Sequence, residues 1–205
     1  MNFSKKEKAL IKKLSIPAKV QDYLNSLRFN FEDQKGHKRE TLKSPLFTLR
    51  SNNAHCLEGA LLGAYVLSQQ GFKPYLMHLK STKGDYDHVI VPFKIGNLWG
   101  ALSKTNHAVL RYREPIYKNI RELAMSYFHE YFLHNGQKTL RQYSALLNLN
   151  TFEKGWETLE GDLWGIDEEL DKIKHYDIVP KLYIKKLRKA DQIEIETGKI
   201  VEYKN

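Results

Sequence analysis

The single cysteine of this chain lies where a helix is predicted to begin, and this placement constrains the fold most. The stretch 52–62 sets Cys56 directly before a run of apolar residues that predicts a buried helix. Asn52 or Asn53 is expected to cap this helix, because a short side-chain oxygen accepts N–H groups of the first turn. Gly71 is expected to end it. A thiol in the first turn faces the positive end of the helix dipole, which lowers its pKa.

Strands are predicted downstream of this helix. The segment Pro74–Leu79 predicts a short strand, and the segment His88–Phe93 predicts a second strand that opens with a histidine. The dipeptide Gly-Asn at 96–97 is typical of a two-residue hairpin turn. The segment Leu98–Leu102, which carries Trp99, is expected to be the returning strand. The pattern therefore predicts an antiparallel sheet that follows the cysteine helix.

These elements together resemble the core of the transglutaminase-like superfamily, which is similar in arrangement to papain-type cysteine proteases. The resemblance covers roughly Ser44–Ser103, under a third of the chain. It implies an α+β fold in which Cys56 is the nucleophile and His88 is the base. The family usually has an aspartate four residues after the hairpin tryptophan, and this sequence departs from the family with Ser103 at that position. The rest of the chain resembles uncharacterised bacterial proteins.

Strand parity tests whether Ser103 can serve as the third member. If the turn is at 96–97, Ser103 lies on the same face of the hairpin as His88 and is its diagonal neighbour. A serine hydroxyl can accept the imidazole N–H and fix the ring, but it carries no charge to stabilise an imidazolium. Asn106 is a second candidate if the strand ends early. Weak catalysis, or none, is therefore one expectation.

Candidate oxyanion or substrate-binding residues lie near Cys56 and after the hairpin in the sequence. The backbone N–H of Cys56 at a helix start can donate to an oxyanion, and Asn52, Asn53 and Asn106 are the candidate side chains. The alternative is that Cys56 is an inert buried cysteine. A metal site is a competing use of the cysteine and of the histidines near it and downstream, namely His55, His88 and His107. Since no CxxC, HxxxH or HExxH spacing supports it, no metal ligand and no cofactor are expected.

The remaining segments predict mostly helices. Helices are expected over 4–14 with a basic surface, from 15–17 onward, over 116–133 and over 166–174. Residues 30–44, with Gly36, are expected to form a loop that is either a wall of the cleft or a mobile connection. Residues 193–203 alternate apolar and acidic side chains around Thr-Gly and predict a second hairpin.

Length and composition predict one domain without a membrane span. The 205 residues divide into N-terminal helices over 1–43, a core over 44–135 and a helical and hairpin extension over 136–205. No stretch approaches about 18 apolar residues, so no membrane insertion is expected, and no apolar segment follows the first residues to predict a secretory signal. A lone cysteine fits a reducing cytoplasm. The net charge of +9 favours an acidic protein or ligand as partner, while no motif predicts specific nucleic-acid binding.

The functional hypothesis is a cysteine-dependent acyl-transfer enzyme. A peptidase, an amidase or a transglutaminase-like enzyme would act on a peptide or amide through a Cys–His pair. The alternative is a non-catalytic binding protein that retains the scaffold and uses its basic surface to bind an acidic partner. A fold alone does not decide between them, because one fold hosts many functions.

Overall fold

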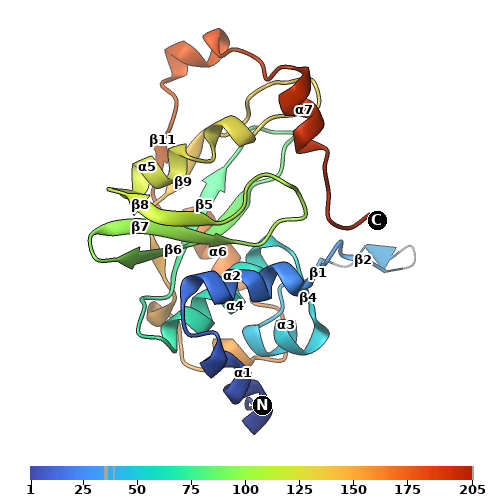
Figure 1. Cartoon of the computed structure of the whole chain (residues 1–205), viewed down its shortest axis with the longest axis vertical. Helices are drawn as coiled ribbons and strands as arrows, with labels where there is room; N and C mark the ends of the chain where they lie inside the picture. The colour runs from blue at the N-terminus through green and yellow to red at the C-terminus, as the bar shows by residue number, and fades with distance from the viewer. Residues whose placement is uncertain (35–36, 39, 205) are drawn as a thin grey trace.

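A central antiparallel sheet organises the molecule. The structure is a computed structural model that describes residues 1–34, 37–38 and 40–204, so Gly36 of the predicted 30–44 loop lies outside the described residues. Within them, the main sheet has seven strands in the order β11-β9-β5-β6-β7-β8, with β10 also paired to β5 (Figure 1). The strands are β5 (Tyr75–Lys80), β6 (His88–Ile95), β7 (Leu98–Ser103), β8 (Arg113–Tyr117), β9 (Gln142–Ser144), β10 (Leu147–Asn148) and β11 (His175–Asp177).

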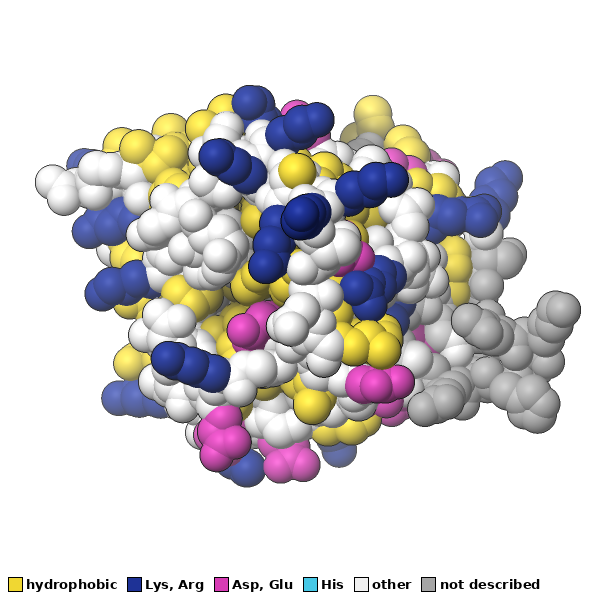
Figure 2. Space-filling model, turned by 90° about the horizontal axis from the view of Figure 1, so that it is seen from below, with side chains coloured by type: hydrophobic (Ala, Val, Ile, Leu, Met, Phe, Trp, Pro, Cys, Tyr) yellow, Lys and Arg dark blue, Asp and Glu magenta, His cyan; other side chains and the backbone are white. Residues whose placement is uncertain are grey.

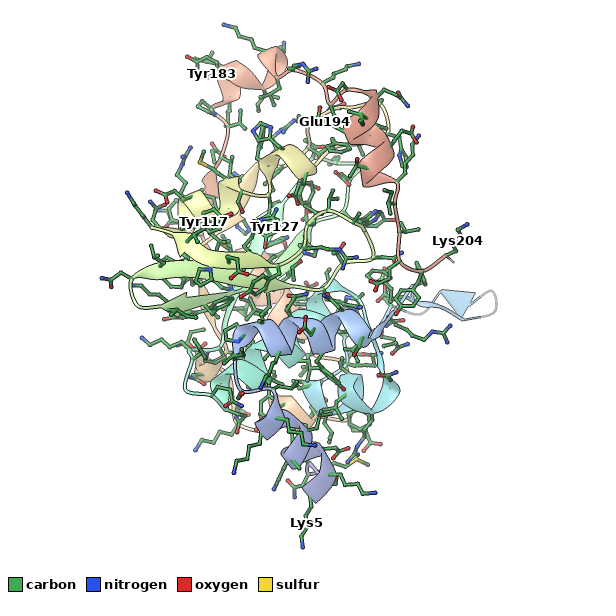
Figure 3. All side chains as sticks on the ribbon, in the orientation of Figure 1. Lys5, Tyr117, Tyr127, Tyr183, Glu194 and Lys204 are labelled. Atoms are coloured by element: carbon green, nitrogen blue, oxygen red, sulfur yellow. The ribbon has the colours of Figure 1, made fainter. Side chains whose placement is uncertain are left out.

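Helices cover both faces of this sheet (Figure 1). On one face lie α1 (Lys5–Lys13), α2 (Pro17–Ser26), α3 (Pro45–Ser51) and α4 (Cys56–Ser68), and on the other lies α5 (Ile120–Met125). Alternation along β6 divides the core: Val89 and Val91 belong to the cluster with α4, while Ile90 belongs to the cluster with α5. Figure 3 labels Tyr127, a fully buried ring of this second cluster. The predicted α+β class, with the cysteine at a helix start, is confirmed.

The central hairpin follows the predicted register. Ile95 pairs with Leu98, and the ladder continues to Ile90 opposite Ser103. The tight turn requires a positive φ at Gly96, which is 58°. The predicted diagonal placement of Ser103 relative to His88 therefore holds.

Helix α4 begins at Cys56, as predicted, but the prediction of its cap was wrong. The N-cap is His55, whose ring accepts Leu57 N–H, and Glu58 completes a capping box. Asn52 instead ends α3 in the left-handed conformation with φ 54°, and Asn53 begins β4 (Asn53–Ala54), which pairs in parallel with β1 (Arg28–Phe29). The imidazole nitrogen accepts the hydrogen bond that we expected an asparagine to accept.

The predicted helix over 116–133 was wrong. The segment contains the end of β8, then α5, then a 3₁₀ turn, η1 (Phe128–Glu130). Asn119 accepts Glu122 N–H and starts α5 anew. The proline at 115 is tolerated in β8 because this strand lies at the sheet edge, where a missing N–H need not break a ladder.

The predicted hairpin over 193–203 was also wrong. Residues Gln192–Gly198 form α7, which Asp191 caps in a capping box with Glu194. The capping box satisfies the N–H groups of the first turn and outweighs the alternating pattern. By contrast, the helices predicted over 4–14 and 166–174 are confirmed as α1, capped by Ser4, and α6 (Trp164–Lys172).

The remaining elements are short. They are β2 (Asp33–Gln34), β3 (His37–Lys38), η2 (Leu149–Thr151), η3 (Trp156–Thr158) and η4 (Lys181–Lys186). Among the described residues, none of the helices has the length and apolar character needed to cross a bilayer. Figure 2, which is seen from the α1 side, shows lysine and arginine side chains spread over that face with acidic side chains between them.

Candidate functional site

Cys56 is the partly exposed first residue of α4 and lies between two imidazoles. The side chains of His55 and His88 are the groups that interact with its thiol. Burial raises the pKa of the thiol, but the interactions with the His55 and His88 side chains outweigh burial and lower the pKa from 9.0 to about 5. The arrangement therefore favours a thiolate, which is the nucleophilic form of cysteine.

His88 opens β6 and is buried, and its ring orientation follows from the hydrogen bonds of Ser103. The Nε2 atom of His88 lies 2.7 Å from Ser103 Oγ. The Ser103 hydroxyl donates its only hydrogen to the carbonyl of Leu110, so its oxygen must accept from His88. The proton of His88 is thus on Nε2, and the unprotonated Nδ1 is the atom left to act as a base.

Ser103 is in turn fixed by Gln21, a residue that the sequence interpretation missed. Gln21 is buried on α2, and its side chain donates to the Ser103 carbonyl at 2.8 Å and accepts the Ser103 N–H at 2.9 Å. A glutamine on the apolar face of a helix, beside Val20 and Leu24, was the available signal. Its partner is 82 positions away, so the contact itself could not be found from local pattern.

The candidate asparagines have contacts of their own in the structure. Asn52 is the exposed end of α3, and Asn53 accepts a hydrogen bond from the Lys43 ammonium. Asn106 uses both ends of its amide on the backbone of Tyr203, at 2.9 Å each. The side-chain bonds that the structure gives Asn53 and Asn106 thus lead to other partners than Cys56 and His88.

His107, the other histidine considered for a metal site, also has a different bonding partner. The ring of His107 contacts the carbonyl of Gly198 at 3.0 Å rather than the thiol. Within the described part of the chain, no group of three or more His, Cys, Asp or Glu residues is placed to hold a metal ion. His55, by contrast, helps to lower the pKa of the Cys56 thiol, and sequence reasoning gave it no catalytic role.

Comparisons with known proteins found similar solved structures. No family model matches the chain, and no curated protein matches it. The structure of Legionella pneumophila LapG (EGTA-treated) aligns with 81% of this chain and 85% of that chain, at 13% sequence identity and a TM-score of 0.43. At this degree of likeness the assignment of the site depends on the geometry of this chain alone.

Proposed function

We propose that this protein is a cysteine-dependent acyl-transfer enzyme of the peptidase, amidase or transglutaminase-like kind. Cys56 is the nucleophile, His88 is the base, and Ser103 orients His88. The observation that carries the proposal is a thiol at a helix start whose pKa His88 lowers, with His88 itself hydrogen-bonded to Ser103. The lone cysteine of the chain supports a reducing, cytoplasmic setting. Its net charge of +9 supports an acidic partner.

The reaction begins when the Cys56 thiolate attacks the carbonyl carbon of a peptide or amide. A C–S bond forms, and the carbonyl electrons move to oxygen, where N–H groups of the first turn of α4 stabilise the charge. The intermediate collapses when the C–N bond breaks, and a histidine proton goes to the leaving amine. The resulting thioester is cleaved by water in hydrolysis or by a second amine in transfer. His88 takes the proton of that attacking group, and the thiolate is restored.

Ser103 sets an upper limit on this chemistry. It fixes the tautomer of His88, but it is neutral, whereas an aspartate stabilises the imidazolium that forms during the reaction. We therefore expect slow turnover compared with an enzyme that has a carboxylate at this position.

Acylation by an activated ester tests the proposal. The wild type, Cys56→Ala and His88→Asn are mixed with p-nitrophenyl acetate, and release of p-nitrophenol is followed together with intact mass. The wild type should show a stoichiometric burst and an acetyl adduct, which Cys56→Ala lacks and His88→Asn forms slowly. His134→Asn is the matched control, because this histidine is exposed. A wild type that acylates no faster than Cys56→Ala would refute the proposal and favour the binding-protein alternative.

A further inference from the structure

The ring of His55, the residue before the nucleophile, is hydrogen-bonded on both nitrogens. Its Nε2 lies 2.8 Å from the carbonyl oxygen of Thr41. A carbonyl only accepts, so Nε2 carries a hydrogen in the neutral and in the charged ring alike. The atom that gains or loses the proton is therefore Nδ1, which accepts Leu57 N–H at 3.3 Å. The side chain of Cys56, the next residue, also interacts with this ring.

Carboxylates lie on the far side of this ring. Oε1 of Glu58 is 3.7 Å from His55 Nε2, and Oε1 of Glu32 is 3.6 Å from it. Glu58 is fully buried. Opposite charge within roughly 4–6 Å favours the protonated form of an imidazole.

The hydrogen bonds of Glu58 show which form of its carboxyl group the site contains. All of its bonding partners donate to it; they are the hydroxyl of Thr41, the amide of Asn30 and the backbone N–H groups of Lys43 and His55. A group that only accepts behaves as an ionised carboxylate. Negative charge thus lies beside His55, whereas His88 faces the neutral hydroxyl of Ser103.

We propose that His55 is a further catalytic residue, which holds the proton that Cys56 gives up, with Glu58 and Glu32 as its carboxylates. This inference rests on the proposed function and assigns different tasks to the two histidines. The proton moves from Cys56 Sγ to His55 Nδ1, which leaves a thiolate and an imidazolium, and Leu57 N–H loses its acceptor. In the first half of the reaction His55 gives this proton to the leaving amine. In the second half His88 takes the proton of the attacking water or amine, and that proton returns through Cys56 Sγ to His55 Nδ1, which restores the resting pair.

Other charged groups lie around His55 and Glu58. Burial lowers the pKa of His55, but the hydrogen bond and charge of Cys56, together with Glu58, raise the pKa from 6.5 to about 9. Lys43 lies 3.5 Å from Glu58 and shares its charge. Burial and the nearby Asp171 raise the pKa of Asp167 on α6, and the charges of His78 and His55 only partly oppose this.

The pH dependence of iodoacetamide alkylation tests the inference. The variant His55→Asn removes the titrating ring but retains a good N-cap, so α4 should still begin at Cys56. The wild type should alkylate with an inflection far below the free-thiol value of about 8.5. In His55→Asn the inflection should rise by at least about one pH unit, which makes alkylation about tenfold slower below the new inflection. His88→Asn should move the inflection less, and the control His134→Asn should leave it unchanged.

The outcomes separate this inference from the proposed function. If His55→Asn keeps the low inflection and His88→Asn alone raises it, His88 holds the proton and the inference is wrong, while the enzyme proposal stands. If the wild type itself titrates as a free thiol, both proposals fail. If the His55→Asn variant does not fold, nitrogen NMR of the histidine rings in the wild type tests the same inference without a variant. At neutral pH it should show an imidazolium at His55 and a neutral, Nε2-protonated ring at His88, and the reverse assignment would overturn the inference.

Discussion

At the scale of single residues, one hydrogen decides the geometry of the candidate site. The Ser103 hydroxyl gives its hydrogen to Leu110, and so it must accept from His88. An ionised aspartate at the same place would have no hydrogen to give. The backbone carbonyl of Leu110, which lies in a left-handed conformation with φ 61°, would then face a negative oxygen. The serine is therefore suited to this loop as well as to the histidine.

The variant Ser103→Asp tests both consequences. A carboxylate there should accept the imidazole N–H and favour the charged ring, so alkylation of Cys56 should move to lower pH. The same change should lower the melting temperature, since a buried ion without full pairing costs several kcal/mol, roughly the desolvation penalty per ion. Ser103→Ala is the control, because it removes the hydroxyl without adding charge. A well-folded Ser103→Asp chain with an unmoved alkylation profile would show that Ser103 is not the third member.

The shifted pKa values of Cys56 and His55 also predict a pH profile of stability. The lowered pKa of Cys56 contributes stability that is complete above 9.0 and is lost as pH falls through about 5. The raised pKa of His55 contributes stability that is complete below 6.5 and is lost as pH rises through about 9. Between 6.5 and 9 the two slopes oppose each other and cancel. The melting temperature of the wild type minus that of Cys56→Ser should thus be flat across this range and shrink toward pH 5. A difference that keeps growing toward acid pH would contradict the thiolate assignment.

At the scale of elements, the sequence predicted a helix or strand correctly where a segment carried a single structural signal. The hairpin of β6 and β7 has an unambiguous turn, and its register followed. In α7 two signals competed, and the capping box of Asp191 and Glu194 prevailed over the alternation of Ile193 and Ile195. Ile193 is 76% exposed, so its apolar character says little about what the segment buries.

The partners of the site residues were out of reach of such local patterns. Cys56, His88 and Ser103 could be grouped because they lie on predictable elements. The contact of Gln21 with Ser103 depends on how α2 packs against β7, and the role of His55 depends in part on the carboxylate of Glu32, which comes from another segment. Contacts of this kind are created by tertiary packing, which no short window of sequence contains.

Two glycine-to-alanine substitutions, at Gly59 and at Gly165, test how tightly α4 packs against the residues that follow β7. A Cβ added at Gly59 would lie 2.4 Å from Lys104 Cβ, and Lys104 is buried with its ammonium bonded to the Leu27 carbonyl. Gly59→Ala should therefore destabilise the fold by about 1–3 kcal/mol, the usual cost of overpacking. Gly165→Ala, in α6 with open space around it, should be neutral or stabilising by up to about 1 kcal/mol. Denaturant unfolding of both variants measures this, and equal effects would refute the close packing.

At the scale of the whole molecule, the last residues of the chain hold the loop that follows β7. Backbone hydrogen bonds join Glu202 to Asn106 at 2.8 Å and Ala108 to Ile200 at 2.9 Å. Figure 3 labels Glu194 on α7 and Lys204 near the chain end, which bracket this segment. The same loop continues to Leu110, which accepts the Ser103 hydroxyl. The end of the chain is thus connected to the base at the site through one loop.

This connection gives Asn106 a structural role that can be separated from the oxyanion role expected from the sequence. Asn106→Ala removes both amide bonds to the Tyr203 backbone, so it should cost about 1–3 kcal/mol and speed hydrogen exchange at Tyr203. Tyr203→Pro is the matched variant, since it removes the donated N–H but leaves Asn106 intact. If Asn106 acts only by holding the chain end, both variants should slow acylation of Cys56 by p-nitrophenyl acetate to a similar, small extent. An oxyanion donor costs about 10²–10³ in rate when it is removed. A loss of that size in Asn106→Ala alone would restore the catalytic assignment, because Tyr203→Pro loosens the same contact without touching the amide.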